Sequence, residues 1–479
     1  MAITRIIYWL GCAVIMIAAL MAITAFAALL MVDLKMVTVM GVTAICLVLL
    51  GSLFVLTTTK TPSRETNSDA LVFLLLFWGL IPLTAAIPYW ITFPELGLLR
   101  GYFTAVSALT TTGANGYVVE TLPSTLILWQ SLLQFFGGIF VATFAVVILA
   151  ALNLTGTGIH RSALFTLKKG ELFTRLIGIG RVISGVYLLI ASICFVLMAL
   201  GGTNVFDALC LSLSGVSTGG MTPRSEDLFL YVPRFSTFVL MLACGFGAMN
   251  VAVVWDAIRM RNWMNFRRLL TNIEHRTLIA MGLALTLFGL FYAGIQNLFP
   301  LFVESVFFIS TAGFVYDPIS LEQVPSVVLI SLALIGGSAL STAGGLKIIR
   351  IILLFKHLGT DISRSSHPSR VLPVQFKHRQ VPDRAFLSIW LYFFGYTLVF
   401  GLGIVCLGAV GLNFTDATSV SGATLSNIGP LLPSTLPDTG LRWPELTQLQ
   451  MLVSSALMLI GRVEVLAVLV LMSPSFWRQ

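Results

Sequence analysis

The chain has 479 residues, of which 57% are hydrophobic and only 10% are charged, whereas a soluble domain carries about 25% charged residues. Its mean hydropathy of +0.96 excludes a water-soluble globular protein. Its net charge of +8 sits mainly in short connections between apolar segments, and none of these adjoins a soluble domain large enough to read nucleic acid. The sequence therefore predicts an all-α integral membrane protein in a lipid bilayer, without a nucleic-acid partner.

Long stretches without charge mark the predicted spans in chain order. They lie between Arg5 and Asp33, Lys35 and Lys60, Asp69 and Glu95, Glu120 and His160, Arg181 and Asp207, Arg234 and Asp256, Arg276 and Glu304, Glu322 and Lys347, and Arg384 and Asp416, with a last stretch from Leu446 to Trp477 that only Arg462 and Glu464 interrupt. A helix needs about 20 residues to cross the hydrocarbon core, so we expect about ten spanning helices. The first uncharged run exceeds the ~7–15-residue core of a signal peptide, and we expect a retained helix there.

Lysine and arginine gather in three connections, at 161–181, 259–276 and 347–384. Because positive charge stays inside, these loops and both termini are predicted to be cytoplasmic. All five histidines, including His275, are assigned to these loops, which leaves no buried histidine for a proton relay. The six cysteines form no CxxC pair, which argues against disulfides and zinc.

A fourfold internal repeat follows the first two spans. We divide the chain into two N-terminal helices (1–66) and four repeats (67–160, 161–258, 259–370 and 371–479). Each repeat is predicted to contain a helix, a short re-entrant pore helix, a glycine-bearing loop and a second helix. The four loops read Thr-Thr-Gly-Ala at 111–114, Ser-Thr-Gly-Gly at 217–220, Ser-Thr-Ala-Gly-Phe at 310–314 and Ser-Asn-Ile-Gly-Pro at 426–430. Small residues often only let helices pack closely, but packing gives no reason for the same element to recur in the same place in every repeat.

A loop at membrane depth is tolerated where it is buried in protein or lines water, so four such loops suggest a ring around a central pore. Backbone carbonyls around an axis can replace the water of a dehydrated cation without burying formal charge. Glycine permits the backbone departures that this arrangement needs. The short helices would add partial negative charge at their C-terminal ends.

Two further features lie in predicted spans. The run from Gly336 to Gly345 holds four glycines with Ser and Thr, which disfavours a straight helix. It fits either close packing against a neighbour or a broken helix whose loop (about 336–347) blocks the pore below the filter. Arg462 is costly at membrane depth and is expected to face an aqueous interior or a partner.

The four loops resemble the degenerate filter segments of the Trk/Ktr/HKT cation transporters, and the two additional N-terminal spans resemble the TrkH branch of that superfamily. The resemblance covers the chain from about Ala70 to its end. It implies ion-facing filter positions at Thr111, Thr112, Gly113, Thr218, Gly219, Gly220, Thr311, Ala312, Gly313, Asn427, Ile428 and Gly429. It also implies an intramembrane gate formed by Gly336, Gly337, Gly344, Gly345, Lys347 and Arg462.

The resemblance implies a potassium uptake pore, because a glycine at position 113 goes with potassium preference and a serine there with sodium. It implies multi-pass insertion in a bacterial inner membrane, a homodimer, and a TrkA-like cytosolic ring that binds nucleotide and contacts the basic loops. No nucleotide-binding motif occurs in this chain, which is expected to bind no cofactor, with potassium as its substrate.

Three other functions compare differently with the sequence. A sodium-permeable or sodium-coupled member of the same superfamily stays possible, because Ala312 and Met221 depart from the common filter residues. The basic linker at 154–181 departs as well, which affects how a regulator would dock. A secondary transporter of a small metabolite would show two inverted halves rather than four parallel units. An enzyme is not expected, since no nucleophile, metal cluster or carboxylate pair lies in the predicted membrane region.

Overall fold

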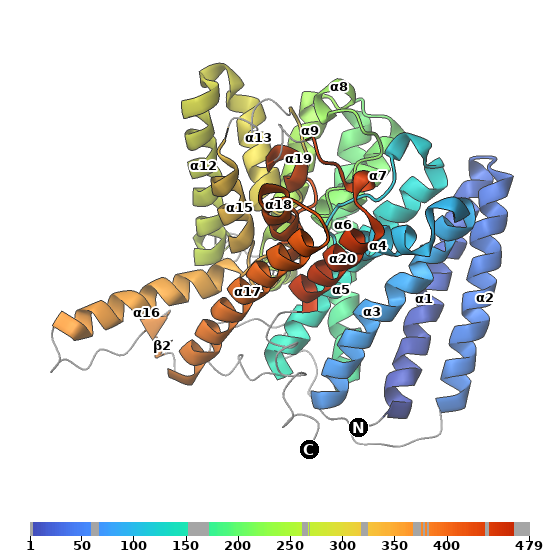
Figure 1. Cartoon of the computed structure of the whole chain (residues 1–479), viewed down its shortest axis with the longest axis horizontal. Coiled ribbons are helices and arrows are strands. Elements are labelled where there is room, and N and C mark those ends of the chain that lie inside the picture. The colour runs from blue at the N-terminus through green and yellow to red at the C-terminus, as the bar shows by residue number, and fades with distance from the viewer. Residues whose placement is uncertain are drawn as a thin grey trace.

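The computed structural model describes residues 3–463 except for 59–66, 152–171, 261–266, 268, 318–323, 367–374, 377–378, 381–382 and 436–439 (Figure 1). Apolar composition and length make seven of its helices candidates for spanning a membrane. These are α1 (Ile3–Leu30), α2 (Leu34–Thr58), α3 (Asn67–Thr92), α5 (Ser124–Ala151), α6 (Leu172–Leu200), α12 (Ile273–Ala293) and α17 (Asp383–Ala409). The predicted all-helical membrane class is confirmed.

Four shorter helices have identical lengths. They are α4 (Leu98–Leu109), α7 (Val205–Val216), α13 (Leu298–Ile309) and α18 (Phe414–Leu425), each of 12 residues. At 1.5 Å per residue each is about 18 Å long, which is too short to cross the ~30 Å hydrocarbon core. Asparagine N-caps begin two of them, with the Asn204 and Asn413 side chains accepting from backbone N–H groups of the first turn.

Two of the expected spans are broken. Helix α9 (Arg234–Ala248) meets α10 (Val251–Met260) at a bend of 104°, and the pair together could form an eighth span. Helix α15 (Ser326–Ile335) stops before Gly336, and α16 (Ile348–Ser366) begins only after a loop. The last helix, α20 (Gln448–Val463), has 16 described residues. These breaks, together with the end of the described residues at Val463, account for the difference from the ten uninterrupted spans that the sequence predicted. Glu464 and most of the first basic linker lie outside the described residues.

The remaining elements are short. They are α8 (Leu228–Tyr231), α19 (Leu431–Thr435), the 3₁₀ turns η1 (Pro94–Leu96), η2 (Val119–Thr121), η5 (Ile295–Asn297) and η6 (Trp443–Glu445), and an antiparallel pair, β1 (Gln375–Phe376) with β2 (Arg379–Gln380).

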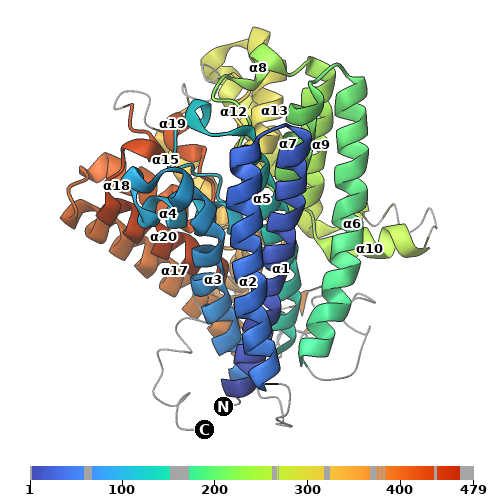
Figure 2. The ribbon, with the colours of Figure 1, turned by 90° about the vertical axis from the view of Figure 1, so that its right-hand side faces the viewer.

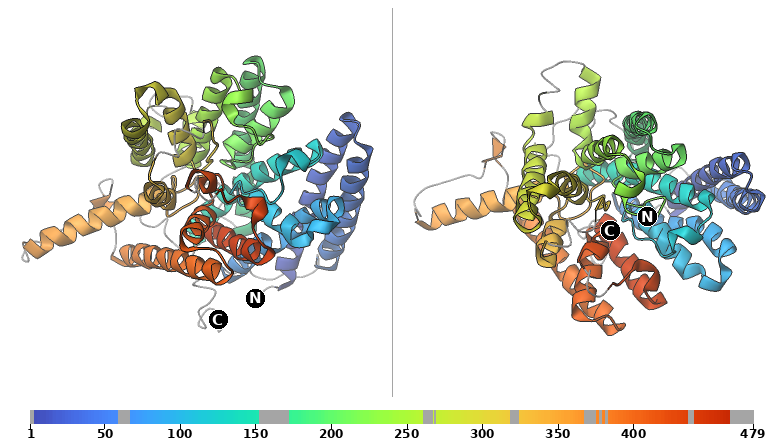
Figure 3. Two further views of the ribbon diagram at one scale, coloured as in Figure 1. Left: turned by 45° about the horizontal axis from the view of Figure 1, so that its top comes forward. Right: turned by 90° about the horizontal axis from the view of Figure 1, so that it is seen from above.

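The elements surround a common centre. Seen from above, α1 and α2 lie together at one edge and α16 extends away from the body (Figure 3). Figure 2 shows α1 and α2 side by side along their length. Helices α1, α3, α4 and α5 share one hydrophobic core, in which Phe77 and Trp78 pack edge-on against Phe144.

Close backbone approach joins α1 to α2. A Cβ added at Gly51 would lie 2.7 Å from the Ile15 side chain and 2.9 Å from the Gly11 carbonyl oxygen, so the two glycines face each other. Between helices in lipid, where no hydrophobic gain drives association, such small-residue contacts provide the packing.

We predict that Gly51→Val lowers the thermal unfolding temperature of the detergent-purified protein, because overpacking costs about 1–3 kcal/mol. Gly41→Val is the matched control, since Gly41 lies on the same helix with no atom within 4 Å of its added Cβ. Equal shifts in the two variants would show that the contact between α1 and α2 contributes nothing particular to stability.

Candidate functional site

Each of the four short helices ends in the same way. Two residues after each helix, the chain enters the left-handed region at a residue other than glycine, with φ of 51° at Thr111, 54° at Thr218, 62° at Thr311 and 54° at Asn427. For threonine this conformation is uncommon and costs about 1–3 kcal/mol. Strain repeated at the same step of four segments is typical of a functional site rather than of chance.

Backbone hydrogen bonds explain the turn. The N–H groups of Thr111, Thr218, Thr311 and Asn427 each donate to the carbonyl three residues earlier, at 3.0, 3.0, 2.9 and 3.2 Å. Carbonyls at the helix end are thereby satisfied, as in left-handed helix caps. The helix ends at this turn, and the residues that follow it form the loop.

The four loops touch one another in chain order. A Cβ added at Gly113 would lie 2.4 Å from the Gly219 oxygen, and one at Gly220 would lie 2.1 Å from the Ala312 oxygen. A Cβ at Gly313 would lie 2.9 Å from the Ile428 side chain. The ring closes because the Gly429 N–H donates to the Thr112 oxygen at 2.5 Å. The structure thus brings all twelve predicted filter residues into one ring, and only Gly113 among them is more than slightly exposed.

The fourth loop differs from the other three. Gly113, Gly220 and Gly313 have positive φ, whereas Gly429 does not. The Gly429 carbonyl accepts from the Trp443 indole N–H at 3.0 Å and from the Leu432 N–H at 3.2 Å. The Ile428 carbonyl accepts from the Leu431 N–H at 3.1 Å. These hydrogen bonds occupy two of the predicted filter carbonyls of the fourth loop, just as Gly429 and Arg462 occupy the Thr112 and Thr111 carbonyls of the first.

Side chains outside the loops hold the backbone in place. In the first repeat the Gly116 N–H donates to the Thr104 hydroxyl at 3.2 Å, and in the third the Tyr316 N–H donates to the Glu304 carboxylate at 3.1 Å. Both contacts join a pore-helix residue to the residue twelve positions later. The second loop is held from α5, where the Gln134 amide donates to the Gly219 oxygen at 2.8 Å.

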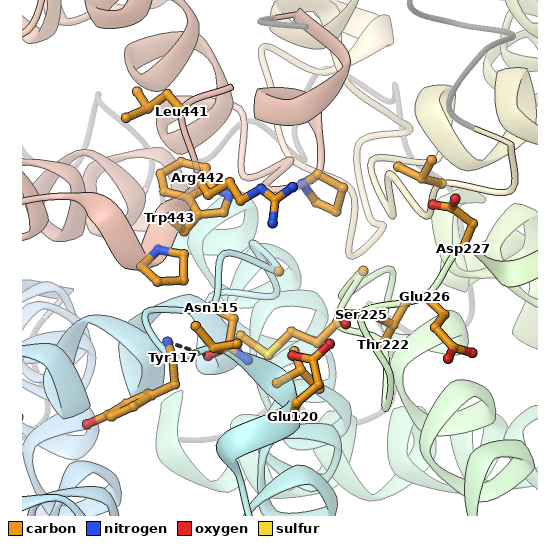
Figure 4. A pocket seen from close by; sticks show the side chains of 18 of the residues that line it. Asn115, Tyr117, Glu120, Thr222, Ser225, Glu226, Asp227, Leu441, Arg442 and Trp443 are labelled. Atoms are coloured by element: carbon orange, nitrogen blue, oxygen red, sulfur yellow. Dashed lines mark hydrogen bonds between the residues drawn. The ribbon is translucent and has the colours of Figure 1, made fainter. Parts of the chain in front are cut away.

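A cavity of about 850 Å³ lies beside the ring, with Gly113 and Gly220 in its lining (Figure 4). Glu120, Glu226 and Asp227 also line it, together with one basic residue, Arg442. Burial, and then the neighbouring carboxylate of Asp317, raise the pKa of Asp227. The cavity forms an entrance to the ring whose wall carries more negative than positive charge.

The loop from Gly336 to Lys347, which we call the gate loop, lies against the other side of the ring. Its Thr342 hydroxyl accepts from the Thr218 hydroxyl at 2.9 Å, and its Gly344 N–H donates to the Thr311 hydroxyl at 3.0 Å. A Cβ added at Gly344 would lie 1.8 Å from the Ser426 oxygen. The gate loop therefore contacts the second, third and fourth of the predicted filter segments.

Two buried cations border this loop. Arg462 donates to the Thr342 carbonyl and to the Thr111 hydroxyl, at 2.5 Å in each case, and also to the Thr110 carbonyl. Lys347 donates back to the Ser341 carbonyl at 3.4 Å and to the Ala343 carbonyl. Arg462 thus joins the gate loop to the first predicted filter segment, and Lys347 forms hydrogen bonds within the gate loop itself.

The assignment of His275 to a cytoplasmic loop was wrong. The side chain is fully buried near the start of α12, where its Nε2 accepts from the Asn250 N–H at 3.0 Å, at the break between α9 and α10. The adjacent Glu274 accepts from the Ala339 N–H of the gate loop at 2.8 Å. The search for segments without charged residues could not predict this burial, because Glu274 and His275 lie next to Arg276 in a basic stretch.

The described residues contain no group of three or more His, Cys, Asp or Glu side chains that could hold a metal. The oxygens that the ring can present to an ion are neutral: backbone carbonyls, the hydroxyls of serine and threonine, and the side-chain amide oxygen of Asn427. Such weak-field neutral ligands suit a monovalent cation in a pore.

Comparisons with known proteins agree with this arrangement. Residues 35–303 and 302–479 match the family model described as TrkH, cation transport protein. The chain is 28% identical over 442 residues to the Trk system potassium uptake protein TrkH of Escherichia coli K12, covering 90% of each chain. It is 30% identical over 438 residues to TrkG of the same organism, covering 88% of each.

The solved structure of the potassium transporter TrkH from Vibrio parahaemolyticus matches over the full length of both chains, with a TM-score of 0.88 and 25% identity. Sequence and fold agree over nearly the whole chain, and the protein belongs to the TrkH family of cation transport proteins.

Proposed function

We propose that this protein takes up potassium through a gated pore whose selectivity filter is the ring of four loops. The closed contact of the four loops in chain order carries the proposal. A ring of neutral oxygens at membrane depth replaces the water of a monovalent cation, and buried formal charge is not needed. The family relatives, which are named as potassium uptake proteins, support potassium as the ion.

Free carbonyl oxygens in the second and third loops support this role. Among the described residues, no hydrogen bond occupies the carbonyls of Thr218, Gly220 or Thr311, which leaves them available to a cation. Each lies at or beside a left-handed residue, where successive carbonyls can point to the same side. The four pore helices direct their C-terminal ends, with partial negative charge, to the ring.

We propose that the described structure is the closed state. The gate loop lies across the ring, and Arg462 and Lys347 place two positive charges on its side, each with less than a tenth of its surface exposed. A cation that leaves the filter would meet both charges at low dielectric, where repulsion is strong. Conduction therefore requires the gate loop and Arg462 to move.

The remaining assignments are proposals of the same kind. We propose a bacterial inner-membrane location with both termini cytoplasmic, the division into two N-terminal helices and four repeats, and a homodimer. The names of the relatives refer to a Trk system, and we propose as partner a TrkA-like nucleotide-binding ring that contacts the basic loops.

Uptake of potassium, rubidium and sodium into proteoliposomes tests the filter. We expect potassium and rubidium to enter well above sodium, and Gly113→Ala to reduce uptake more than about tenfold, since a clash that costs ~1.4 kcal/mol or more at the ring changes an equilibrium by that factor. Gly294→Ala is the control, because Gly294 has φ of 80° but open space around its added Cβ.

Sodium uptake equal to that of potassium would move the protein to the sodium-permeable alternative. If Gly113→Ala and Gly294→Ala reduced potassium uptake equally, backbone strain alone would explain the reduction, and a clash within the ring would not be needed. Absence of cation uptake, in the wild type and in the gate variant described next, would contradict the pore.

The gate is tested by Arg462→Met, which keeps an unbranched apolar stem and removes the charge and all hydrogen bonds to Thr342, Thr110 and Thr111. We expect potassium uptake to rise about tenfold, because hydrogen bonds to charged groups contribute about 1.5–3 kcal/mol each and hold the loop closed. Arg442→Met, on the opposite side of the ring, is the control. Unchanged uptake in a folded Arg462→Met protein would show that this arginine does not restrain the gate.

A further inference from the structure

Gln134 is a buried glutamine on α5 that belongs to no filter segment. Its side chain is completely covered, and its amide N–H donates to the Gly219 carbonyl at 2.8 Å. A Cβ added at Gly219 would lie 2.4 Å from the Gln134 Cδ, so the amide lies flat against the backbone at that glycine. Glycine at 219 is therefore required by this neighbour and not by φ, which is not positive there.

The carbonyl that Gln134 holds lies at the seam between two filter loops. The same Gly219 oxygen is the atom nearest to an added Cβ at Gly113, at 2.4 Å. Movement of this oxygen would change the spacing of the first and second loops directly. One hydrogen bond from α5 thus holds an atom that lies at the contact between these two loops.

Packing alone does not explain a glutamine here. Its other amide atom, Oε1, is buried and accepts no hydrogen bond from the described residues. Leaving such an atom unsatisfied costs about 1–3 kcal/mol, which an apolar side chain of the same size would avoid. One turn earlier on the same face of α5, Gln130 exchanges hydrogen bonds with Asn115 of the first loop at 3.3 and 3.4 Å.

We propose that Gln134 is a positioning residue for ion selectivity, which fixes the Gly219 carbonyl so that the ring cannot close around an ion smaller than potassium. This inference rests on the proposed filter function. In the size-based account of selectivity, a cage held at one width discriminates against sodium because its oxygens cannot move inward. A polar stripe on α5 then acts as a rigid backing for the first two loops.

The test compares Gln134→Met with Gln450→Met in the full-length protein. Gln450 is the matched control, because it is also buried and donates to a backbone carbonyl, that of Val410 at 3.1 Å, away from the ring. Two measurements are made: the uptake ratio of potassium to sodium in proteoliposomes, and the thermal stabilisation by potassium over sodium in detergent. The second does not require an open gate, since an ion that binds the folded state raises its unfolding temperature.

We expect Gln134→Met to lose about fivefold in potassium preference by either measure, the ratio that corresponds to one ordinary hydrogen bond, and Gln450→Met to keep it. An unchanged preference in Gln134→Met, or an equal loss in Gln450→Met, would overturn the inference. Gln134→Leu replaces the methionine variant if that protein does not fold. A wild type without potassium preference would instead contradict the proposed function, so the two failures are distinguishable.

Discussion

The structure depends on one constraint: four separate chain segments must meet within contact distance at a single axis. At the ring an added Cβ would approach the next loop to 2.1 Å at Gly220 and 2.4 Å at Gly113, so little more than backbone fits there. Helices cannot bring backbones this close over several residues. Each segment therefore ends its helix in a left-handed residue, and the strain of Thr111 and its three equivalents is the cost of this convergence.

The same constraint explains why the four repeats share one backbone conformation, although different side chains hold each loop in place. Every loop needs an outside partner to hold it in the strained turn, but its surroundings differ. The first is held by Arg462, the second by Gln134, the third by Glu304 and the fourth by Trp443. Four loops with different supports need not contribute equally to an ion site, and Gly429, the one filter glycine without a positive φ, shows such a difference.

Local patterns therefore allowed prediction of the elements and of the loops, but not of their supports. The long segments without charged residues predicted the long helices, and the recurring glycines predicted the four loops. Both patterns can be recognised from residues that are close together in the sequence. No local pattern marks Gln134 or Trp443 as a support. Gln134 lies 85 residues from the loop residue that it contacts, and Trp443 lies 14 residues from its own. His275 was misplaced for the opposite reason: nearby arginines indicated a cytoplasmic loop, whereas the fold buries this side chain against the α9–α10 break.

The buried polar residues below the ring connect two broken helices into one unit. The gate loop separates α15 from α16, and a second break separates α9 from α10. The two breaks are joined by a hydrogen bond, in which the Val251 N–H at the start of α10 donates to the Leu340 carbonyl of the gate loop at 2.9 Å. Glu274 and His275, adjacent on α12, hold a backbone N–H on each side of this junction. A gate loop that moves must exchange these partners or carry α10 with it. Because α10 leads directly into a basic connection, this geometry would link the proposed gate to the surface that we propose as cytoplasmic and as the contact for a regulator.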